Sequence, residues 1–352
     1  MRNRTLRTVS LAVSASLAVI AFSGAVASSA SAETSVWLGQ AGGGQTHECM
    51  VRSDGRVKCW GYANPGGYFG GPLGGLPGSY TAATYPFTMT IVSGITTARK
   101  VSVGYYNTCI LLADTTVKCM GDNAYGQLGD GTNVNRNDTP TTVSGLTGVK
   151  DIVLGGQVGG NNAHACALML DGTVKCWGGN NYGQLGDGTT TNRWVPVSVT
   201  GITNAVSIVS GFSTVCAVLS TGSVKCWGYG GLGALGNGNG AYTATNLSTV
   251  PVNVSGVANA VDLSTESLGY GMCARTSAGE VYCWGNVRVP GYTYPGPAKI
   301  AGISGAKQFI PGGCWITAAD TVKCFAPSVP YGAPDQPNIY GELGNGTNCA
   351  IG

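Results

Sequence analysis

The chain has 352 residues, of which 58 are glycine, and only 10% of its residues are charged. Three of its 19 basic residues lie within the first seven positions, and the remainder balances 16 basic against 16 acidic residues. A neutral chain with few charges lacks the electrostatic footprint of a protein that binds nucleic acid or an anionic membrane, so we expect neither partner.

Residues 1–32 are predicted to be a secretory signal peptide. Arg2, Arg4 and Arg7 precede an apolar run rich in Ala, Val and Leu, which ends in the small residues Ala30-Ser31-Ala32. A membrane anchor is the alternative, but serines interrupt the run and no stop-transfer charges follow it. We therefore expect cleavage near Ala32, a secreted protein, and a mature chain of residues 33–352 without a membrane span.

The mature chain contains six cysteine pairs, and the two members of every pair are ten positions apart. One spacing that occurs six times indicates six copies of a structural unit. The pairs are Cys49 with Cys59, Cys109 with Cys119, Cys166 with Cys176, Cys216 with Cys226, Cys273 with Cys283, and Cys314 with Cys324. Secretion favours six disulfides, with buried free thiols as the alternative. A zinc site is disfavoured because the spacing is too long. Cys349 is left over, and it pairs with another chain, caps a blade or stays free.

Each copy predicts about four short strands and no helix. A β-rich run such as Lys100–Val103 precedes the cysteine pair, and a glycine-rich loop followed by a valine-rich run such as Val195–Val199 comes after it. Four-stranded units of roughly 50 residues are typical of propeller blades. We therefore predict an all-β fold in which residues 33–352 form one β-propeller of antiparallel blades, with six blades favoured over seven.

The segment between the cysteines predicts a tight hairpin. A three-residue loop, Ser53-Asp54-Gly55, would close with Gly55 in the left-handed region. This register places Cys49 opposite Cys59 on one face, at a separation that a disulfide can bridge, whereas a two-residue loop would separate them. The second and sixth copies are expected to carry Thr115 and Thr321 in place of the glycine, so those turns should be strained or of another type.

The third copy, CALMLDGTVKCWGGNNYGQLGDGT at residues 166–189, resembles the repeat of the regulator of chromosome condensation family, also called alpha-tubulin suppressor repeats. Degenerate copies cover most of residues 36–347. The resemblance implies a β-propeller, typically of seven blades, and it brings guanine-nucleotide exchange, the activity of the founding members, as one possible function. The cysteine pairs are additional to those members and resemble a secreted bacterial branch.

The sequence lacks the common motifs of catalytic sites. The motifs GxSxG, HExxH and the phosphate-binding Walker loop do not occur. His47 and His164 stand two residues before the first cysteine of their copies, which favours a structural role in capping the turn. The two GDGT strings lack the several carboxylates of a calcium loop. We expect no enzyme activity, no cofactor and no metal. The aromatic slot after the second cysteine predicts packing between blades, and it holds Trp60, Trp177, Trp227 and Trp284.

Irregular loops are the candidate partner-binding sites. Residues 62–87, 286–298 and 326–340 are rich in Pro and Tyr where other copies have the regular glycine loop. Tyr and Gly are favoured where a surface grips a partner, and loops on a rigid scaffold often carry function. A surface insertion without a role is the alternative. The candidate residues are Tyr62, Tyr68, Phe69, Tyr80, Tyr85, Phe87, Tyr292, Tyr294, Tyr331 and Tyr340.

These features predict a secreted, disulfide-stapled propeller that binds a protein or a cell-envelope polymer as a monomer. Two other functions stay open. A secreted propeller of this type could inhibit an enzyme by occluding it. Guanine-nucleotide exchange follows from the family resemblance, but secretion would place the chain away from any small GTPase.

Overall fold

The computed structural model describes residues 47–61, 90–156, 162–239, 246–265, 271–286, 296–301, 303–310 and 314–324. These residues form antiparallel sheets, with one short 3-10 turn at Gly231–Gly233. No helix in this part of the chain is long and apolar enough to cross a membrane. The described strands belong to six sheets, one for each cysteine pair, which confirms the predicted all-β propeller of six blades.

The blades follow one another in chain order. Blade 1 contains β1 (His47–Val51), β2 (Val57–Gly61) and β3 (Thr90–Ile91). Blade 2 contains β4 (Ala98–Val103), β5 (Asn107–Leu112), β6 (Val117–Gly121) and β7 (Arg136–Thr142). Blade 3 contains β8 (Val149–Gly155), β9 (His164–Met169), β10 (Val174–Gly178) and β11 (Arg193–Ser198). Blade 4 contains β12 (Ala205–Ser210), β13 (Thr214–Leu219), β14 (Val224–Tyr229) and β15 (Leu247–Asn253).

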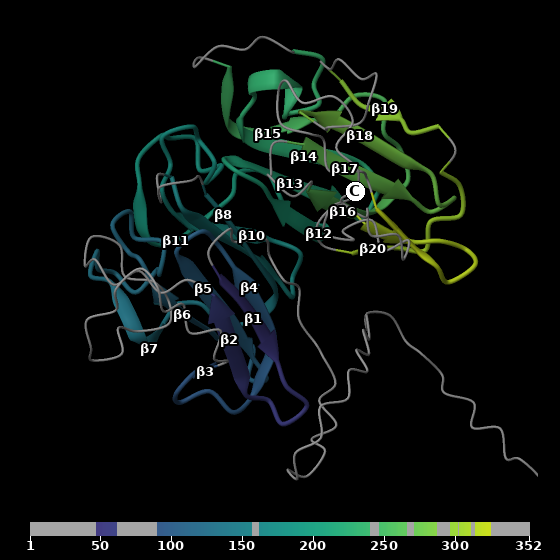
Figure 1. The fold of residues 1–352 in the computed structure, drawn as a ribbon. Coiled ribbons are helices and arrows are strands. Elements are labelled where there is room, and N and C mark those ends of the chain that lie inside the picture. The colour runs from purple at the N-terminus through teal and green to yellow at the C-terminus, as the bar shows by residue number, and fades with distance from the viewer. Residues whose placement is uncertain are drawn as a thin grey trace, which may run out of the picture.

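Blade 5 contains β16 (Ala260–Thr265), β17 (Gly271–Thr276), β18 (Val281–Gly285) and β19 (Ala298–Lys299). Blade 6 contains β20 (Gln308–Ile310), β21 (Cys314–Ile316) and β22 (Val322–Cys324). In Figure 1 the blades follow one another along an arc, from purple and blue through teal and green to yellow. The first strands of successive blades contact each other, β4 with β8, β8 with β12, β12 with β16 and β16 with β20, while β1 contacts β4.

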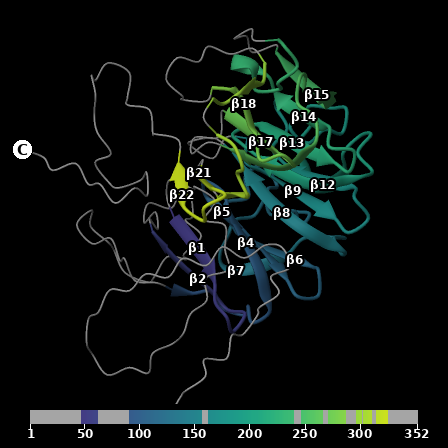
Figure 2. The same cartoon turned by 90° about the vertical axis from the view of Figure 1, so that its right-hand side faces the viewer.

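The hydrophobic core is divided among the interfaces between neighbouring blades, which we call seams. In the seam between blades 2 and 3, Cys109, Cys119 and Leu128 of blade 2 pack with Leu154 and Trp177 of blade 3. The second strands β5, β9 and β13 are buried at every residue, because a neighbouring blade covers each face of them. Figure 2 shows blades 3 and 4 stacked in this way, β8 and β9 against β12. Each unit therefore depends on its neighbours for burial, as in other repeat proteins.

The predicted hairpin register is confirmed. Cys49 lies opposite Cys59, and Val51 opposite Val57. Gly55 has φ +76° and Gly172 has φ +82°, so the glycine supplies the left-handed residue of the turn. In the second copy Thr115 takes this conformation with φ +67°. The prediction for the sixth copy was wrong, because Asp320 with φ +56° is the left-handed residue there rather than Thr321. Asp320 stands six positions after the first cysteine, where the glycines stand in the other copies.

Five of the six predicted disulfides are present, with a Cα–Cα distance of 4.1 Å in each. They join Cys49 with Cys59, Cys109 with Cys119, Cys166 with Cys176, Cys216 with Cys226, and Cys273 with Cys283. These ten cysteines are at most 2% exposed and lie in the seams, which excludes the alternative of buried free thiols for these five pairs.

The sixth pair is described only in its backbone. Cys314 and Cys324 lie opposite each other in the register of β21 and β22, as the paired cysteines do in the other blades. Their side chains are outside the described part of the chain, so the sixth disulfide stays a prediction. Cys349 is outside the described residues as well.

Candidate functional site

The two ends of each blade differ in their connections. In blade 2 the register places Val103 opposite Thr108, and Gly121 opposite both Asn107 and Arg136. The connections 104–106 and 122–135 therefore leave the sheet at the same end, as do 179–192 in blade 3 and 211–213 in blade 4. We call this end the loop face. The disulfide-bridged hairpins turn at the opposite end, which we call the turn face.

The ten aromatic residues predicted to bind a partner lie outside the described residues, so their placement stays a prediction. The strands that precede their segments are described. These are β2 in blade 1, β18 in blade 5 and β22 in blade 6. The last residues of β2 and β18 lie at the loop face.

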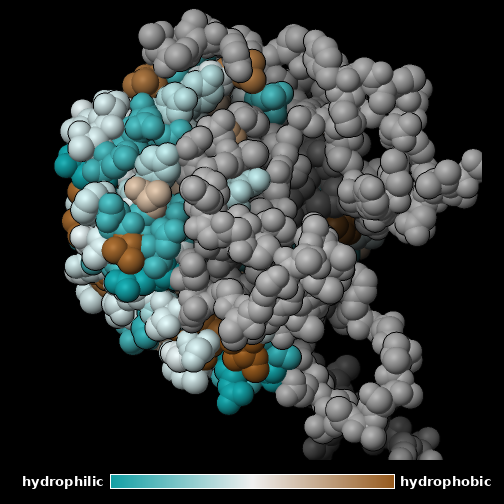
Figure 3. Space-filling view, turned by 60° about the vertical axis from the view of Figure 1, so that its left-hand side comes forward, coloured by the Kyte–Doolittle hydropathy of each residue, from teal (hydrophilic) through white to brown (hydrophobic). Residues whose placement is uncertain are grey.

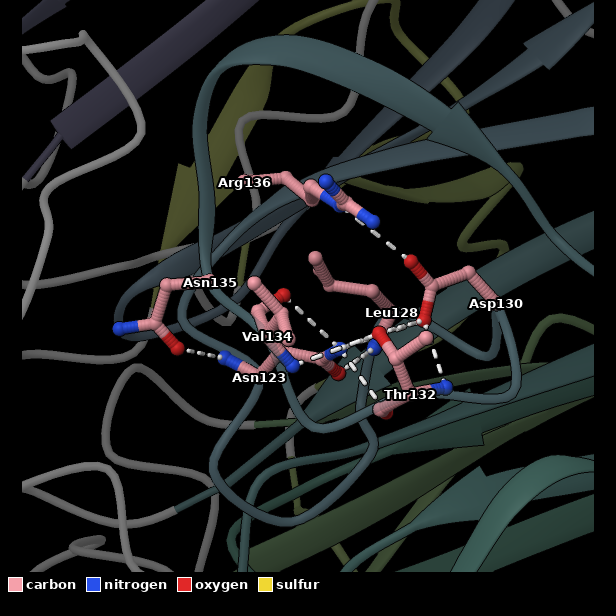
Figure 4. Close-up of polar contacts among 7 residues, drawn as sticks. All are labelled: Asn123, Leu128, Asp130, Thr132, Val134, Asn135 and Arg136. Carbon is pink, nitrogen blue, oxygen red and sulfur yellow. Dashed lines mark hydrogen bonds and ion pairs between the residues drawn. The ribbon is translucent and has the colours of Figure 1, made fainter.

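The glycine loops of blades 2 and 3 on the loop face are each organised by a buried asparagine, as Figure 4 shows for blade 2. The Asn123 side chain donates from Nδ2 to the carbonyl oxygens of Thr132 at 3.0 Å and Val134 at 3.1 Å. Its Oδ1 accepts from the Leu128 amide at 2.9 Å, and its backbone amide donates to Asn135 Oδ1 at 2.8 Å. Asn180 makes the equivalent bonds in blade 3. One side chain thus fixes a 14-residue connection, residues 122–135.

The aspartates of the two GDGT strings accept hydrogen bonds from residues of their own loops. Asp130 Oδ1 accepts from the Thr132 amide at 3.0 Å and from its hydroxyl at 2.6 Å, and Arg136 Nε lies 3.5 Å from Oδ2. Partial burial acts to raise the pKa of Asp130, but these hydrogen bonds outweigh it and hold the pKa below its usual value. Asp187 is held in the same way by Thr189 and Arg193. Within the described ranges no group of three or more His, Cys, Asp or Glu is placed to hold a metal.

The aromatic slot after the second cysteine connects neighbouring blades, as predicted. The indole Nε1 of Trp177 donates to the Gln127 carbonyl of the preceding blade at 3.0 Å, and Trp227 does the same to Gln184 at 3.0 Å. Both tryptophans are 0% exposed. A Cβ on Gly129 would lie 2.7 Å from Trp177 Nε1, and this glycine has φ +69°, so only glycine lets the loop approach the indole.

The two histidines are seam residues and not simply turn caps. His47 Nε2 lies 2.7 Å from Thr108 Oγ1 of blade 2, and His164 Nε2 lies 2.8 Å from Ser210 Oγ of blade 4. His164 Nδ1 also lies 3.0 Å from the Asn162 carbonyl, which is the predicted capping contact. Burial lowers the pKa of His47 to about 3 and that of His164 to about 4, so both imidazoles are neutral at pH 7.

Asn107 takes the position of these histidines in blade 2. Leu154 of blade 3 corresponds to Ser210 of blade 4. Each residue directly precedes a glycine, which is Gly155 at the end of β8 and Gly211 just after β12. A Cβ on Gly104 would contact both the Asn107 side chain and Leu154. The Asn107 amide is fully buried and has no hydrogen-bond partner among the described residues. The position two residues before the first cysteine therefore makes a hydrogen bond across the seam where it is His47 or His164. Where it is Asn107, it makes no such bond.

The loop face carries a set of half-buried aromatic side chains that the sequence reasoning missed. Tyr105 and Tyr106 meet edge to face at 4.4 Å between ring centroids, and Tyr182 and Tyr229 at 5.1 Å across the seam between blades 3 and 4. The signal was present in the regular copies, where aromatic residues occur before the second strand and within the glycine loop. The set is Tyr105, Tyr106, Tyr125, Tyr182, Phe212 and Tyr229.

Charge is scarce on the loop face. The described connections 104–106, 122–135, 179–192, 211–213 and 230–239 contain three aspartates and no Lys or Arg. Asp122 is 2% exposed; burial raises its pKa, and Gln127 Nε2 donates to it at 2.8 Å. Elsewhere, the face drawn in Figure 3 shows hydrophobic residues as isolated brown groups among teal and white ones. The loop face thus combines aromatic groups with Gly, Asn and Thr and offers few charges.

Models of a known repeat family match part of this chain. The model of the regulator of chromosome condensation (RCC1) repeat matches residues 117–159 and 171–218, and a second model of the same repeat matches residues 98–127 and 157–184. The probable E3 ubiquitin-protein ligase HERC4 of Homo sapiens is 35% identical over 121 residues, which are 34% of this chain and 11% of the ligase. The probable ligase HERC6 of Homo sapiens is 32% identical over 154 residues, 44% of this chain and 14% of the ligase. The chain therefore matches a small part of these relatives.

Solved structures share the fold. Yeast RCC1 (Prp20) bound to Kap60 has a TM-score of 0.60 and 17% identity, covering 79% of this chain and 67% of that one. Human WBSCR16 has a TM-score of 0.58 and 20% identity, covering 74% and 65%. At these identities the likeness concerns the fold alone. Residues 98–218 of this chain, which contain the recurrent glycine loops and the Trp177 bond across a seam, are therefore similar to RCC1 repeats.

Proposed function

We propose that this chain is a protein-binding module whose loop face contacts the partner, and that it has no catalytic activity of its own. The observation that carries the proposal is the set of half-buried aromatic side chains among Gly, Asn and Thr on a face with few charges. Tyr supplies a large contact area at a small cost in conformational entropy, and Asn and Gly supply adaptable hydrogen bonds. Binding surfaces of antibodies have this composition.

The rigidity of the loops supports the same proposal. Asn123 and Asn180 close their loops from within, and the tryptophan bonds hold each loop against the next blade. A surface that is ordered before binding loses less conformational entropy when a partner docks. The glycine loops therefore form a preorganised platform beneath the aromatic groups.

Two further observations favour binding over catalysis. His47 and His164 are at most 2% exposed and engaged in seams, so neither offers a base to a bound substrate. Among structural neighbours, yeast RCC1 is seen bound to Kap60, and Prp20p was studied for its binding to Gsp1p and histones. The match to HERC4 covers 11% of that ligase, so we do not propose ligase activity for this chain.

We further propose that residues 1–32 are removed as a signal peptide near Ala32 and that the chain is secreted. The five disulfides support this proposal, because such bonds persist in oxidising compartments. Secretion would disfavour guanine-nucleotide exchange and leave proteins and envelope polymers of the cell exterior as partners. Mass spectrometry of unreduced protein from the culture medium tests the cleavage site and the disulfide count; intact residues 1–32 in that sample would refute it.

Capture from culture medium on the immobilised mature chain tests the binding face. We expect a triple substitution of Tyr105, Tyr125 and Phe212 to Ala to abolish capture while the chain stays folded. Leu170→Ala is the matched control, because Leu170 is an apolar residue 65% exposed on the turn face. Capture that survives the triple substitution and is lost with Leu170→Ala would place binding on the other face. A single captured enzyme would favour inhibition, and retention on insoluble cell wall would favour an envelope polymer.

A further inference from the structure

The seam between blades 3 and 4 holds two buried polar atoms without hydrogen-bond partners at the loop face. They are Oδ1 of Asn162 and Oγ of Ser213, in residues that are 4% and 1% exposed. Buried polar groups in native proteins nearly always have a partner, and an unpaired one is destabilising. The fold therefore retains two groups that do not contribute to its stability.

The backbones of both residues lie beside Gln184. Gln184 Nε2 donates to the Asn162 carbonyl at 3.4 Å. A Cβ on Gly228 would clash with the Ser213 carbonyl and lie 3.2 Å from the Gln184 Cα, so Ser213 and Gln184 approach the same glycine. Asn162 also has φ +63°, a conformation that is uncommon outside glycine and that is often found at functional sites.

The backbone amides of two aromatic residues bind Gln184 and Ser213. The Tyr182 amide donates to Gln184 Oε1 at 2.9 Å, and the Tyr229 amide donates to the Ser213 carbonyl at 2.8 Å. Their rings meet edge to face at 5.1 Å, and both side chains are half-buried. His164, the nearby titratable residue, is neutral at pH 7 because burial lowers its pKa to about 4. The cluster therefore presents aromatic surface, one acceptor and one hydroxyl, without a charge.

The seam between blades 2 and 3 shows that this arrangement is not part of the repeat. Blades 2 and 3 share the glycine loop YGQLGDGT. Blade 2, however, has Tyr105 at the position that Asn162 takes in blade 3. Blade 3 has Ala163 and Gly179 at the positions that Ser213 and Tyr229 take in blade 4. The same backbone thus carries different side chains at these two seams. The Asn162 amide and the Ser213 hydroxyl occur together only at the seam between blades 3 and 4, of the two compared.

We propose that this seam is a subsite for an uncharged amide group of the protein partner, from an Asn or Gln side chain or an exposed peptide bond. The amide N–H would donate to Asn162 Oδ1, and the amide carbonyl would accept from Ser213 Oγ, with the half-buried pair of Tyr182 and Tyr229 rings beside it. The proposal rests on the proposed function and names the chemistry that the loop face recognises. Solvent does not reach either atom in this conformation, so binding requires a side-chain rotation at the seam.

Titration of the isotope-labelled mature chain with acetamide, followed by NMR, tests the subsite. We expect saturable shifts of the backbone amides of Asn162, Tyr182 and Ser213, and no saturable shifts with acetate or with glucose. The variants Ser213→Ala and Asn162→Gly should each weaken acetamide binding about tenfold, the effect of one lost hydrogen bond. Glycine is suited to the left-handed conformation of residue 162, so that variant keeps the backbone.

Stability separates a binding role from a structural one. Ser213→Ala removes an unpaired hydroxyl and should leave the melting temperature unchanged or raise it. Ser210→Ala is the matched control three residues earlier; it removes the partner of buried His164 and should lower the melting temperature by a few degrees. A Ser213→Ala variant that unfolds or melts as early as Ser210→Ala would overturn the proposal, because the hydroxyl would then be structural.

The remaining outcomes distinguish this subsite from the binding face itself. Absence of saturable shifts with acetamide would overturn the subsite, and saturable shifts with glucose alone would replace it with a carbohydrate site. Capture of a protein by the loop face that is unaffected by Ser213→Ala and Asn162→Gly would also refute the subsite while leaving the proposed function intact. The triple variant of Tyr105, Tyr125 and Phe212 tests that function without replacing any of the four residues assigned to the subsite.

Discussion

The turn face and the loop face of this propeller are joined across the seams by contacts of different kinds. On the turn face, the same backbone bond recurs from the start of one blade to the hairpin turn of the blade before it, such as the Val149 amide to the Thr115 carbonyl at 3.0 Å and the Ala205 amide to the Gly172 carbonyl at 2.9 Å. Within the blades, five hairpins also carry a disulfide between cysteines ten residues apart. On the loop face, the contacts across the seams use side chains, such as Trp227 with Gln184 and His47 with Thr108. The turn face can therefore remain uniform, while the loop face changes with each pair of neighbouring blades. Four predictions test this contrast.

The largest effect should come from the tryptophans that join loops to the next blade. Trp227→Ala removes a fully buried indole and its bond to the Gln184 carbonyl, so we expect a loss of about 3–5 kcal/mol in the free energy of unfolding. Trp194→Ala is the control, since Trp194 is 45% exposed on β11, and it should cost about 1 kcal/mol or less. Denaturant unfolding measures both, and equal losses would contradict the role assigned to the slot.

Removing one disulfide should have the next largest effect. The double variant Cys166→Ala and Cys176→Ala opens a bridge with a separation of ten residues, for which loop entropy predicts a loss of about 2–3 kcal/mol. Denaturant unfolding under non-reducing conditions gives the value. A variant as stable as the parent would mean that the hairpin stays equally ordered in the unfolded chain. Adding reductant to the parent should cost more than the double variant, because all the bridges open.

Acid should weaken the seams that contain histidine. The folded pKa values of His47 and His164, about 3 and about 4, lie below that of an unfolded histidine, so the unfolded chain binds more protons as the pH falls. Stability should therefore decrease from about pH 6.5 downward, by about 1 kcal/mol per pH unit for each histidine, until each folded pKa is reached. Unfolding measured between about pH 6.5 and pH 5 should show a smaller slope in a His47→Gln, His164→Gln variant. An unchanged slope would contradict the assignment.

The smallest effect should come from a turn. Thr115 is a β-branched residue with φ +67°, so Thr115→Gly should raise the free energy of unfolding by up to about 1 kcal/mol. The gain is reduced because the Gly148 amide loses its bond to Thr115 Oγ1 at 3.1 Å. Gly172→Thr, the reverse change in blade 3, should destabilise by a similar amount or more. Thermal melting of the two variants checks the opposite signs, and a shift of both in one direction would contradict the turn geometry.

Features set by neighbours in the chain could be predicted from the sequence, and one exception is instructive. The register of Cys49 with Cys59 follows from the turn residue Gly55 and the period of a strand. The same reasoning placed Cys226 opposite its partner Cys216, and Cys283 opposite Cys273. The sixth turn was misassigned because Asp320 and Thr321 were not aligned by their distance from the first cysteine. Asp320 tolerates the left-handed region better than a β-branched residue does, which agrees with its place there.

The aromatic residues of the loop face could not be predicted from the departures of single loops from the repeat. Tyr62, Tyr292 and the other candidates attracted attention because their loops depart from the repeat. Tyr182 and Tyr229 lie in regular copies, where nothing in a single copy shows that their rings meet. The same holds for His164 and Ser210, which are 46 residues apart.

The amino-acid sequence alone determined the number of blades, the hairpin register and the pairing of the cysteines, because these depend on short-range geometry repeated along the chain. Only the tertiary structure decided which side chains meet across a seam, where the histidines find their partners and where polar atoms are left unpaired. The physical reason is that each seam is formed by two copies of the unit about 50 residues apart, so its contacts depend on how one copy differs from the next.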